Sequence, residues 1–361
     1  MIIDSHVHAF PALAGAPGFG CPQEYLDLLQ YGMARHALPT RRVGDNAPVG
    51  GPALWSADDR SPAGRTDVAF RVGRFGRLLW SADGVDYYKQ YLPAWLADMA
   101  AGPDLLVALM DSAGVARAVL QNDSFYGKLN EFFAEAVRTY PDRFIGTIHV
   151  DEDVAHTDAG SAELHRGACE LGLRGLFFGA HQYWLRGGGV PLDGPEMRPF
   201  WRQAAALDLV VFWSVSGGPM TDEARYLDQM RRVARVLETH PTLKSIIVGG
   251  APNRFFDDPR TESPMLATLA EHAEVCLEVV YPVYVGLREE YPFPTALDSV
   301  RRLYDRLGPR RLVWGSDLPN VERHCTYQQA LGYLDWYCPL PRADLALILG
   351  GNLARLFGIP V

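Results

Sequence analysis

Two histidines near the start of the chain have the spacing of a metal-binding pair. Residues 2–8 are IIDSHVH, an apolar stretch with strand character that ends in two imidazoles. Successive side chains of a strand point to opposite faces, so His6 and His8 are expected on one face. The other face then carries Ile3, Ser5 and Val7. Imidazole nitrogen binds zinc, iron, manganese and nickel, and the pair therefore predicts a metal site. Two histidines that only form hydrogen bonds are the simpler alternative.

Two carboxylates lie on late strands. Asp317 follows the apolar residues 311–315, and in a closed barrel the eighth strand lies beside the first, so this carboxylate is expected to complete the metal site. The alternative is a turn aspartate in Ser-Asp-Leu-Pro. Glu278 interrupts an apolar strand, where a carboxylate must be paired, protonated or bound to metal. We predict a metal-binding or catalytic role for Glu278, with a structural partner such as Arg311 as the alternative.

Three further histidines are candidate ligands. His149 lies near the end of one expected strand and His181 directly after the next. A lone strand histidine is more often a hydrogen-bonded core residue than a ligand, but both of these lie at strand ends, where ligands are expected. His324 lies on a loop shortly after Asp317, where exposure to solvent is the alternative. All three are predicted to approach the same site, and His181 is also a candidate catalytic residue.

The elements that would position these side chains follow a regular alternation. After the first strand, which ends at His8, strands are expected at residues 116–121, 144–150, 173–180, 209–215, 245–248, 275–280 and 311–315. Helices are expected at 105–113, 129–140, 161–171, 196–207, 222–240, 264–274 and 295–307, with more helices after 327. Eight strands alternating with helices predict an α/β fold, a (β/α)8 TIM barrel, whose active site lies at the carboxyl ends of the strands.

The expected domain organisation is one barrel, residues 1–361, interrupted by a long insertion after strand one. The insertion covers residues 10–103, too long for an ordinary connection. Its aromatic residues suit a lid over a pocket, and residues 85–99 are expected to form one or two helices. A surface excursion without a role is the alternative.

Composition narrows the classes of partner and compartment. The net charge of −9 argues against nucleic acid and anionic membranes, so a small-molecule substrate is expected. Five widely spaced cysteines without a C-x-x-C motif fit a reduced, cytoplasmic protein. Neither a signal peptide nor an apolar run of about 20 residues is expected. A homo-oligomer is compatible with this class.

Four ordered motifs resemble a known family. They are residues 3–8 (IDSHVH), 140–144 (YPDRF), 315–319 (GSDLP) and 351–357 (GNLARLF), supported by 170–181 (ELGLRGLFFGAH). Together they are similar to the amidohydrolase-related barrels of the aminocarboxymuconate-semialdehyde decarboxylase type. The resemblance implies a divalent metal held by His6, His8, a histidine after strand five and Asp317, with a catalytic histidine after strand six. Here those two other positions fall at about Ser214 and Gly249, neither of which can replace an imidazole.

The absence of histidines at these two positions favours a reaction other than the usual one of the family. His149, His181, Glu278 and His324 would give a mixed nitrogen and oxygen ligand set with enough donors for a second ion, a set that suits iron or manganese. The chain also resembles the branch containing the nonheme diiron monooxygenase of platensimycin and platencin biosynthesis. That resemblance implies an iron-dependent monooxygenase acting on a large apolar, CoA-linked substrate. The alternative is a mononuclear hydrolase or decarboxylase that uses zinc or manganese, with His181 or His149 as base.

Overall fold

The computed structural model describes residues 1–59, 61–179, 189–215, 223–249, 272 and 274–360, and its core is a parallel barrel. Eight strands pair in the order β1-β6-β7-β8-β9-β10-β11-β12. Their bounds are Ile3–Val7, Arg117–Leu120, Phe144–His149, Gly175–Phe178, Val210–Ser214, Ser245–Val248, Val275–Val279 and Leu312–Trp314. A parallel bridge between Val7 and Leu318 joins the last strand region to the first. The predicted (β/α)8 fold is confirmed.

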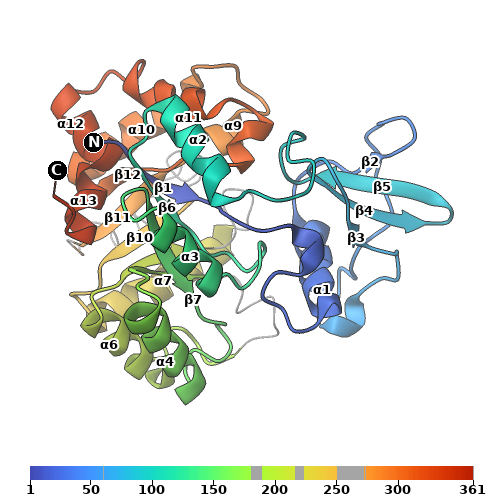
Figure 1. Ribbon diagram of the computed structural model, residues 1–361, viewed down its shortest axis with the longest axis horizontal. Helices are drawn as coiled ribbons and strands as arrows, with labels where there is room; N and C mark the ends of the chain where they lie inside the picture. Colours follow the sequence, from blue (N-terminus) through green and yellow to red (C-terminus); the bar gives the residue numbers. More distant parts are fainter. Residues whose placement is uncertain (60, 180–188, 216–222, 250–271, 273, 361) are drawn as a thin grey trace.

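Helices surround the barrel (Figure 1). They are α2 (Pro103–Ala113), α3 (Asn130–Thr139), α4 (Asp158–His165), α6 (Arg198–Ala206), α7 (Glu223–Thr239), α9 (Pro282–Val285), α10 (Pro294–Leu307), α11 (Tyr327–Asp335), α12 (Arg342–Ala346) and α13 (Asn352–Phe357). Local sequence sets several of their ends. Gly114, at φ +72°, ends α2, and Thr326 and Gln329 form a reciprocal capping box at the start of α11. The helix expected at 264–274 falls largely outside the described residues.

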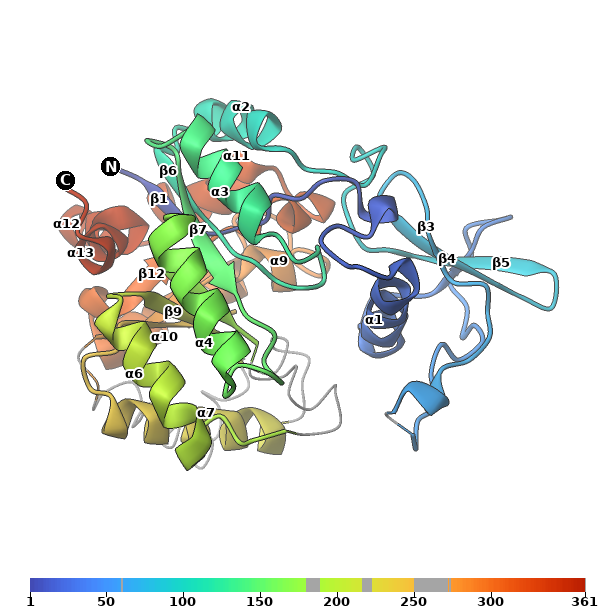
Figure 2. The same ribbon diagram turned by 60° about the horizontal axis from the view of Figure 1, so that its bottom comes forward.

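The barrel interior is apolar at the end where the chain begins and polar at the other. All eight strands contribute to one buried cluster: Ile3, Val119, Ile145, Phe177, Val210, Phe212, Ile246, Val248, Cys276 and Val313. Helix α13 closes this end with Leu353, Leu356 and Phe357, which belong to the same cluster. Both chain ends lie on this side in Figures 1 and 2, and β1 runs away from it. Polar side chains are therefore left for the opposite mouth.

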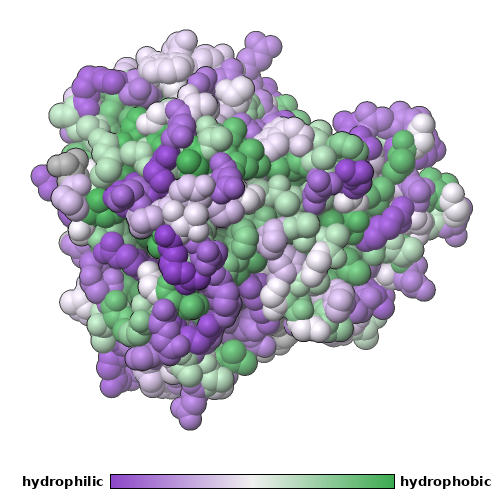
Figure 3. Space-filling model, in the orientation of Figure 1, coloured by the Kyte–Doolittle hydropathy of each residue, from purple (hydrophilic) through white to green (hydrophobic). Residues whose placement is uncertain are grey.

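The insertion forms a lobe beyond that mouth (Figure 2). It contains α1 (Pro22–Arg35) and an antiparallel sheet in the order β2-β5-β4-β3, with bounds Arg41–Arg42, Val85–Gln90, Arg77–Ala82 and Arg71–Val72. The helix expected within residues 85–99 is wrong, because 85–90 pair with β4 as its hairpin partner. Lobe residues such as Tyr25 and Trp80 belong to the same buried cluster as barrel residues. Figure 3 shows mostly apolar residues where the lobe joins the barrel.

Strand β1 departs from strict alternation. Its register against β6 shifts between Asp4 and Val7. As a result the consecutive residues Ser5 and His6 both hydrogen-bond to Glu278, at 2.7 and 2.8 Å, whereas a regular strand would send them to opposite faces. The expected separation of Ser5 from the histidine face is therefore wrong.

No helix among the described residues is long and apolar enough to cross a bilayer.

Candidate metal centre

His6, His8 and Asp317 converge at the barrel mouth. The two histidines sit at the end of β1, and Asp317 follows β12, the neighbouring strand of the closed barrel. His6 Nε2 lies 3.0 Å from His8 Nε2, and Asp317 Oδ1 lies 3.6 Å from His6 Nε2 and 3.2 Å from His8 Nε2. Among the described residues, this is the one group of three or more His, Cys, Asp or Glu with metal-ligand spacing.

The three facing atoms are all hydrogen-bond acceptors. His6 Nδ1 faces the Glu278 carboxylate and His8 Nδ1 faces the carbonyl oxygen of Gln121, at 2.8 and 3.1 Å, so both Nδ1 atoms must carry hydrogen. In the neutral imidazoles both Nε2 atoms then present lone pairs to each other and to a carboxylate oxygen. Such a cluster requires a proton or a cation between its members. Ligands about 2.0–2.2 Å from one ion lie about 3.0–3.5 Å apart, so the spacing fits a divalent metal.

The pKa shifts within the cluster also favour a positive charge at its centre. Burial lowers the pKa of His6, but the carboxylates of Glu278 and Asp317 outweigh burial and raise that pKa to about 9. Burial raises the pKa of Asp317, but the neighbouring His6 and His8 outweigh burial and bring this pKa below its usual value. The site therefore attracts positive charge strongly, and a bound divalent ion would displace the proton on His6.

Glu278 lies behind His6, on its Nδ1 side. Its two oxygens accept hydrogen bonds from Ser5 Oγ, His6 Nδ1, Gln121 Nε2 and the backbone N–H of Gly249, at 2.7–3.1 Å. The side chain is fully buried. A carboxylate on the far nitrogen of a ligating histidine fixes its tautomer and ring orientation. The structure thus places Glu278 against a candidate ligand, outside the three-atom cluster, with the alternative partner Arg311 bonded elsewhere.

Asp4 secures β1 to the strand beside it. It accepts hydrogen bonds from the Ser316 backbone and hydroxyl, from Tyr327 and from the His6 backbone, at 2.6–2.9 Å. Burial raises the pKa of Asp4 to about 6, while its hydrogen bonds act in the opposite direction. These contacts hold β1, which carries His6, in a fixed position relative to the loop that carries Asp317.

Asp317 adopts a left-handed backbone conformation, φ +62°, which costs a residue with a Cβ about 1 kcal/mol or more. Its backbone N–H donates to the His6 carbonyl and its Oδ1 accepts from Asn320 Nδ2, at 2.9 and 2.7 Å. Asn320 Nδ2 also donates to the hydroxyl of Tyr126, whose ring lies 4.4 Å from the His8 ring. Neighbouring groups therefore hold the strained aspartate in place.

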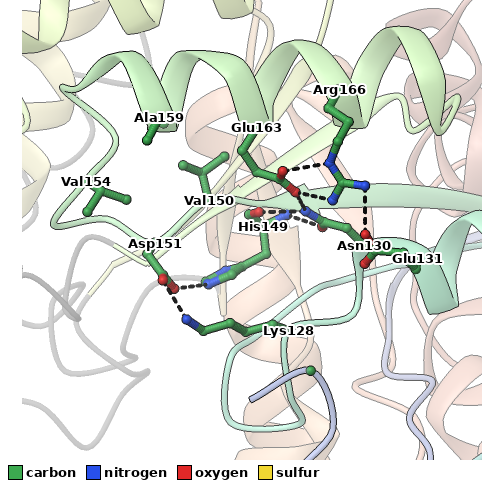
Figure 4. A pocket seen from close by; sticks show the side chains of 12 residues that line it. Lys128, Asn130, Glu131, His149, Val150, Asp151, Val154, Ala159, Glu163 and Arg166 are labelled. Atoms are coloured by element: carbon green, nitrogen blue, oxygen red, sulfur yellow. Dashed lines mark hydrogen bonds and ion pairs between the residues drawn. The ribbon is translucent and has the colours of Figure 1, made fainter. Parts of the chain in front are cut away.

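His149 belongs to a separate cavity beside β7, shown in Figure 4. Its Nε2 lies 3.1 Å from Asp151 Oδ1, and Lys128 Nζ lies 2.6 Å from Asp151 Oδ2. Arg166 also lines the cavity and pairs with two lining carboxylates, those of Glu131 and Glu163. The cavity encloses about 280 Å³ and contains none of His6, His8 or Asp317. His149 is therefore not brought into the described metal cluster.

Replacing Asp151 by asparagine is expected to lower the free energy of unfolding by about 1–2 kcal/mol near pH 6. Burial raises the Asp151 pKa, but His149 and Lys128 hold it below its usual value, so its contribution is lost as pH falls below about 4. Burial lowers the His149 pKa, but Asp151 outweighs burial and raises it, so this contribution is lost as pH rises above about 6.5. Urea unfolding of both proteins should show the largest difference between about pH 4 and 6.5. A difference that does not decline toward pH 9 would contradict the pairing with His149.

His324 does not belong to the three-residue cluster. His324 follows the short helix Asn320–Arg323 and packs beside Gly286, the residue directly after α9. Burial and the nearby Arg323 lower its pKa to about 4. His181 lies outside the described residues. Gly249, where the resemblance led us to expect a catalytic histidine, donates its N–H to Glu278 from a backbone with φ +81° that favours glycine.

Several residues around the cluster were not predicted from the sequence. Gln121 follows β6 directly, and a polar side chain at that position in a barrel is a usable signal. Asn320 begins the short helix Asn320–Arg323, six residues past the end of β12. Tyr126 lies in the loop after β6, six residues past the end of the strand, and no local pattern marks it. Its role depends on ring packing against His8 and Phe10.

Comparison with known proteins supports the barrel and its family. No curated protein matches the chain. Among solved structures, a probable 2-pyrone-4,6-dicarboxylic acid hydrolase from Acinetobacter baumannii is 20% identical, with a TM-score of 0.56 over 72% of this chain and 90% of that one. A 2,6-dihydroxybenzoate decarboxylase from Rhizobium is 18% identical, with a TM-score of 0.54 over 71% and 88%. A dihydroxybenzoic acid decarboxylase from Polaromonas with bound manganese is 19% identical, with a TM-score of 0.52 over 71% and 86%.

At these identities the structural likeness shows the fold alone. The family model described as Amidohydrolase matches residues 3–359, which include both candidate histidines and Asp317. Neither this match nor the structures named above support the expected monooxygenase branch, its iron or its CoA-linked substrate. Because the match spans nearly the whole chain, the protein belongs to the amidohydrolase family.

Proposed function

We propose that this protein is a mononuclear metal-dependent decarboxylase of a small cyclic carboxylic acid. The observation that carries the proposal is the convergence of His6 Nε2, His8 Nε2 and Asp317 Oδ1, which require a proton or a cation between them. A divalent ion held there would act as a Lewis acid toward a carboxylate or carbonyl oxygen of the substrate. Two of the solved structures to which the chain is similar are decarboxylases of dihydroxybenzoic acids.

The surrounding residues prepare the cluster for this task. Glu278 holds the hydrogen of His6 on Nδ1, and the Gln121 carbonyl does the same for His8, so both Nε2 lone pairs point into the site. Asn320 fixes Asp317 Oδ1. Tyr126 covers one side of His8 and limits the access of water. A site held in advance in this way does not have to reorganise when substrate binds.

Decarboxylation breaks the bond to carbon dioxide and replaces it with a bond to a proton that solvent can supply. It is favoured over hydrolysis, which needs a base to take a proton from water. The positions after β9 and β10 where the family resemblance implies histidines are Ser214 and Gly249. Glu278 already accepts four hydrogen bonds and is unsuited to accept a proton from water. Hydrolysis is the second candidate, favoured by the similarity to the probable 2-pyrone-4,6-dicarboxylic acid hydrolase.

Metal-loaded protein is expected to release carbon dioxide from at least one hydroxybenzoic acid under anaerobic conditions. A panel should include 2,6-dihydroxybenzoate for decarboxylation and 2-pyrone-4,6-dicarboxylate for hydrolysis, with product acids and carbon dioxide measured separately. The matched control is the His8→Ala protein, which should be inactive in both assays. Turnover that consumes dioxygen and releases neither carbon dioxide nor a hydrolysed acid would overturn the proposal.

A further inference from the structure

We propose that the inserted lobe is a fixed part of the metal centre, in which Tyr91 positions the ligand Asp317 through Tyr126 and Asn320. The inference rests on the proposed metal site and goes beyond the reaction assigned to it. It changes the role expected for the insertion from a cover over the pocket to a support for one ligand.

The first connection runs through side chains. The hydroxyl of Tyr91, directly after β5 of the lobe, donates to the hydroxyl of Tyr126 at 3.0 Å. The same Tyr126 oxygen accepts from Asn320 Nδ2 at 2.7 Å, and that amide nitrogen donates to Asp317 Oδ1 at 2.7 Å. Tyr91, Tyr126 and Asn320 are all buried, so water does not compete readily for these hydrogen bonds.

The second connection runs through the backbone. Arg323 donates from Nη1 to the carbonyl of Tyr91 at 2.9 Å and from Nε to the carbonyl of Asn320 at 3.0 Å. Its guanidinium therefore joins the lobe to the segment that follows Asp317. Asn320 is thus held on its side chain and on its backbone by groups that both lead back to Tyr91.

Asp317 needs such support because of its own backbone. A left-handed residue with a Cβ persists only where its surroundings determine its conformation. A ligand whose outer hydrogen bonds are removed typically loses about tenfold to hundredfold in metal affinity. The Tyr126 ring adds a second effect, because it packs on His8 and on Phe10, which pairs with Ala101 where the chain returns from the lobe.

The chain offers a matched control at the same interface. Tyr25, on α1 of the lobe, donates its hydroxyl to the carbonyl of Phe125 at 2.9 Å. Tyr25→Phe removes a lobe-to-barrel hydrogen bond of the same chemistry, and neither partner is hydrogen-bonded to Asp317 or Asn320. A general loosening of the lobe would affect this variant as much as Tyr91→Phe.

The test measures Zn²⁺ affinity of the full-length metal-free protein by competition with a chromophoric chelator. Tyr91→Phe is expected to weaken Zn²⁺ binding by about three- to tenfold, and Asn320→Leu by about tenfold to hundredfold. Tyr126→Phe provides a conservative variant should Asn320→Leu not fold, with an effect similar to that of Tyr91→Phe. Tyr25→Phe should bind Zn²⁺ as the wild type does.

Unchanged affinity in both Tyr91→Phe and Tyr126→Phe would overturn the inference and leave the proposed function standing. An equal loss in Tyr25→Phe would overturn it as well, because the effect would then be general loosening. A wild-type protein that binds no Zn²⁺ or Mn²⁺ would overturn both proposals.

Discussion

Replacing His8 by alanine is expected to lower metal affinity by at least about a hundredfold and to abolish turnover. His8 Nε2 lies 3.0 Å from His6 Nε2 and 3.2 Å from Asp317 Oδ1, so its removal leaves two donors and opens one side of the site. The measurement is metal content after dialysis, together with the dissociation constant for Zn²⁺ or Mn²⁺. The fold should persist, because the apolar end of the barrel is independent of this side chain.

The control for this experiment is His156→Ala. His156 is exposed and lies in the turn that follows β7, so its loss removes one imidazole without touching the cluster. Equal metal content in wild type, His8→Ala and His156→Ala would refute the site. Metal loss in His156→Ala alone would place the site elsewhere.

Replacing Glu278 by glutamine is expected to weaken metal binding by about tenfold to hundredfold and to destabilise the fold by about 3 kcal/mol. Four donors point at the carboxylate, and an amide nitrogen in its place would face at least one of them. The Nδ1 hydrogen of His6 would lose its anionic acceptor, so the imidazole would bind a cation less firmly. Chelator competition and urea unfolding report the two effects separately.

Glu152→Gln is the matched control. Glu152 is a buried carboxylate just beyond β7 that accepts from the backbone N–H of Gly179 at 2.9 Å and does not belong to the three-residue cluster. It should lose stability without losing metal affinity. If Glu278→Gln loses only stability, then Glu278 is a structural residue and does not support a ligand. If the Glu278→Ala protein keeps metal-dependent turnover at the wild-type rate, a catalytic role for Glu278 is excluded as well.

Much of the fold could be predicted because its signals are local. Apolar runs of four to six residues alternate with amphipathic helices closed by glycine or proline, and this pattern specified the eight strands nearly to the residue. The exceptions lie in the inserted lobe, where α1 and the strands β2 to β5 were not predicted. They include the hairpin at residues 77–90. Its second strand carries no clear period, and only pairing with its neighbour makes it a strand. The lobe was therefore expected as an insertion but with the wrong secondary structure.

The candidate ligands could be predicted for a related reason. His6, His8 and Asp317 stand at the ends of strands one and eight, and barrel closure places those ends together whatever the loops do. His149 also stands at a strand end, yet its strand is two positions away from β1 in the sheet, and Asp151 and Lys128 draw it into another cavity. Position at the mouth is therefore necessary for a ligand but does not suffice.

By itself, the sequence determined the barrel and the order of its strands, and it predicted His6, His8 and Asp317 as candidate ligands, because these depend on periodicity and on residue type at strand ends. Only the tertiary structure decided that Glu278 contacts Nδ1 of His6, across 272 positions of sequence. It also decided that Asn320, Tyr126 and Tyr91 lead from Asp317 into the lobe. Hydrogen bonds between distant side chains depend on packing geometry to within a few tenths of an ångström, and no local pattern of residues encodes that geometry.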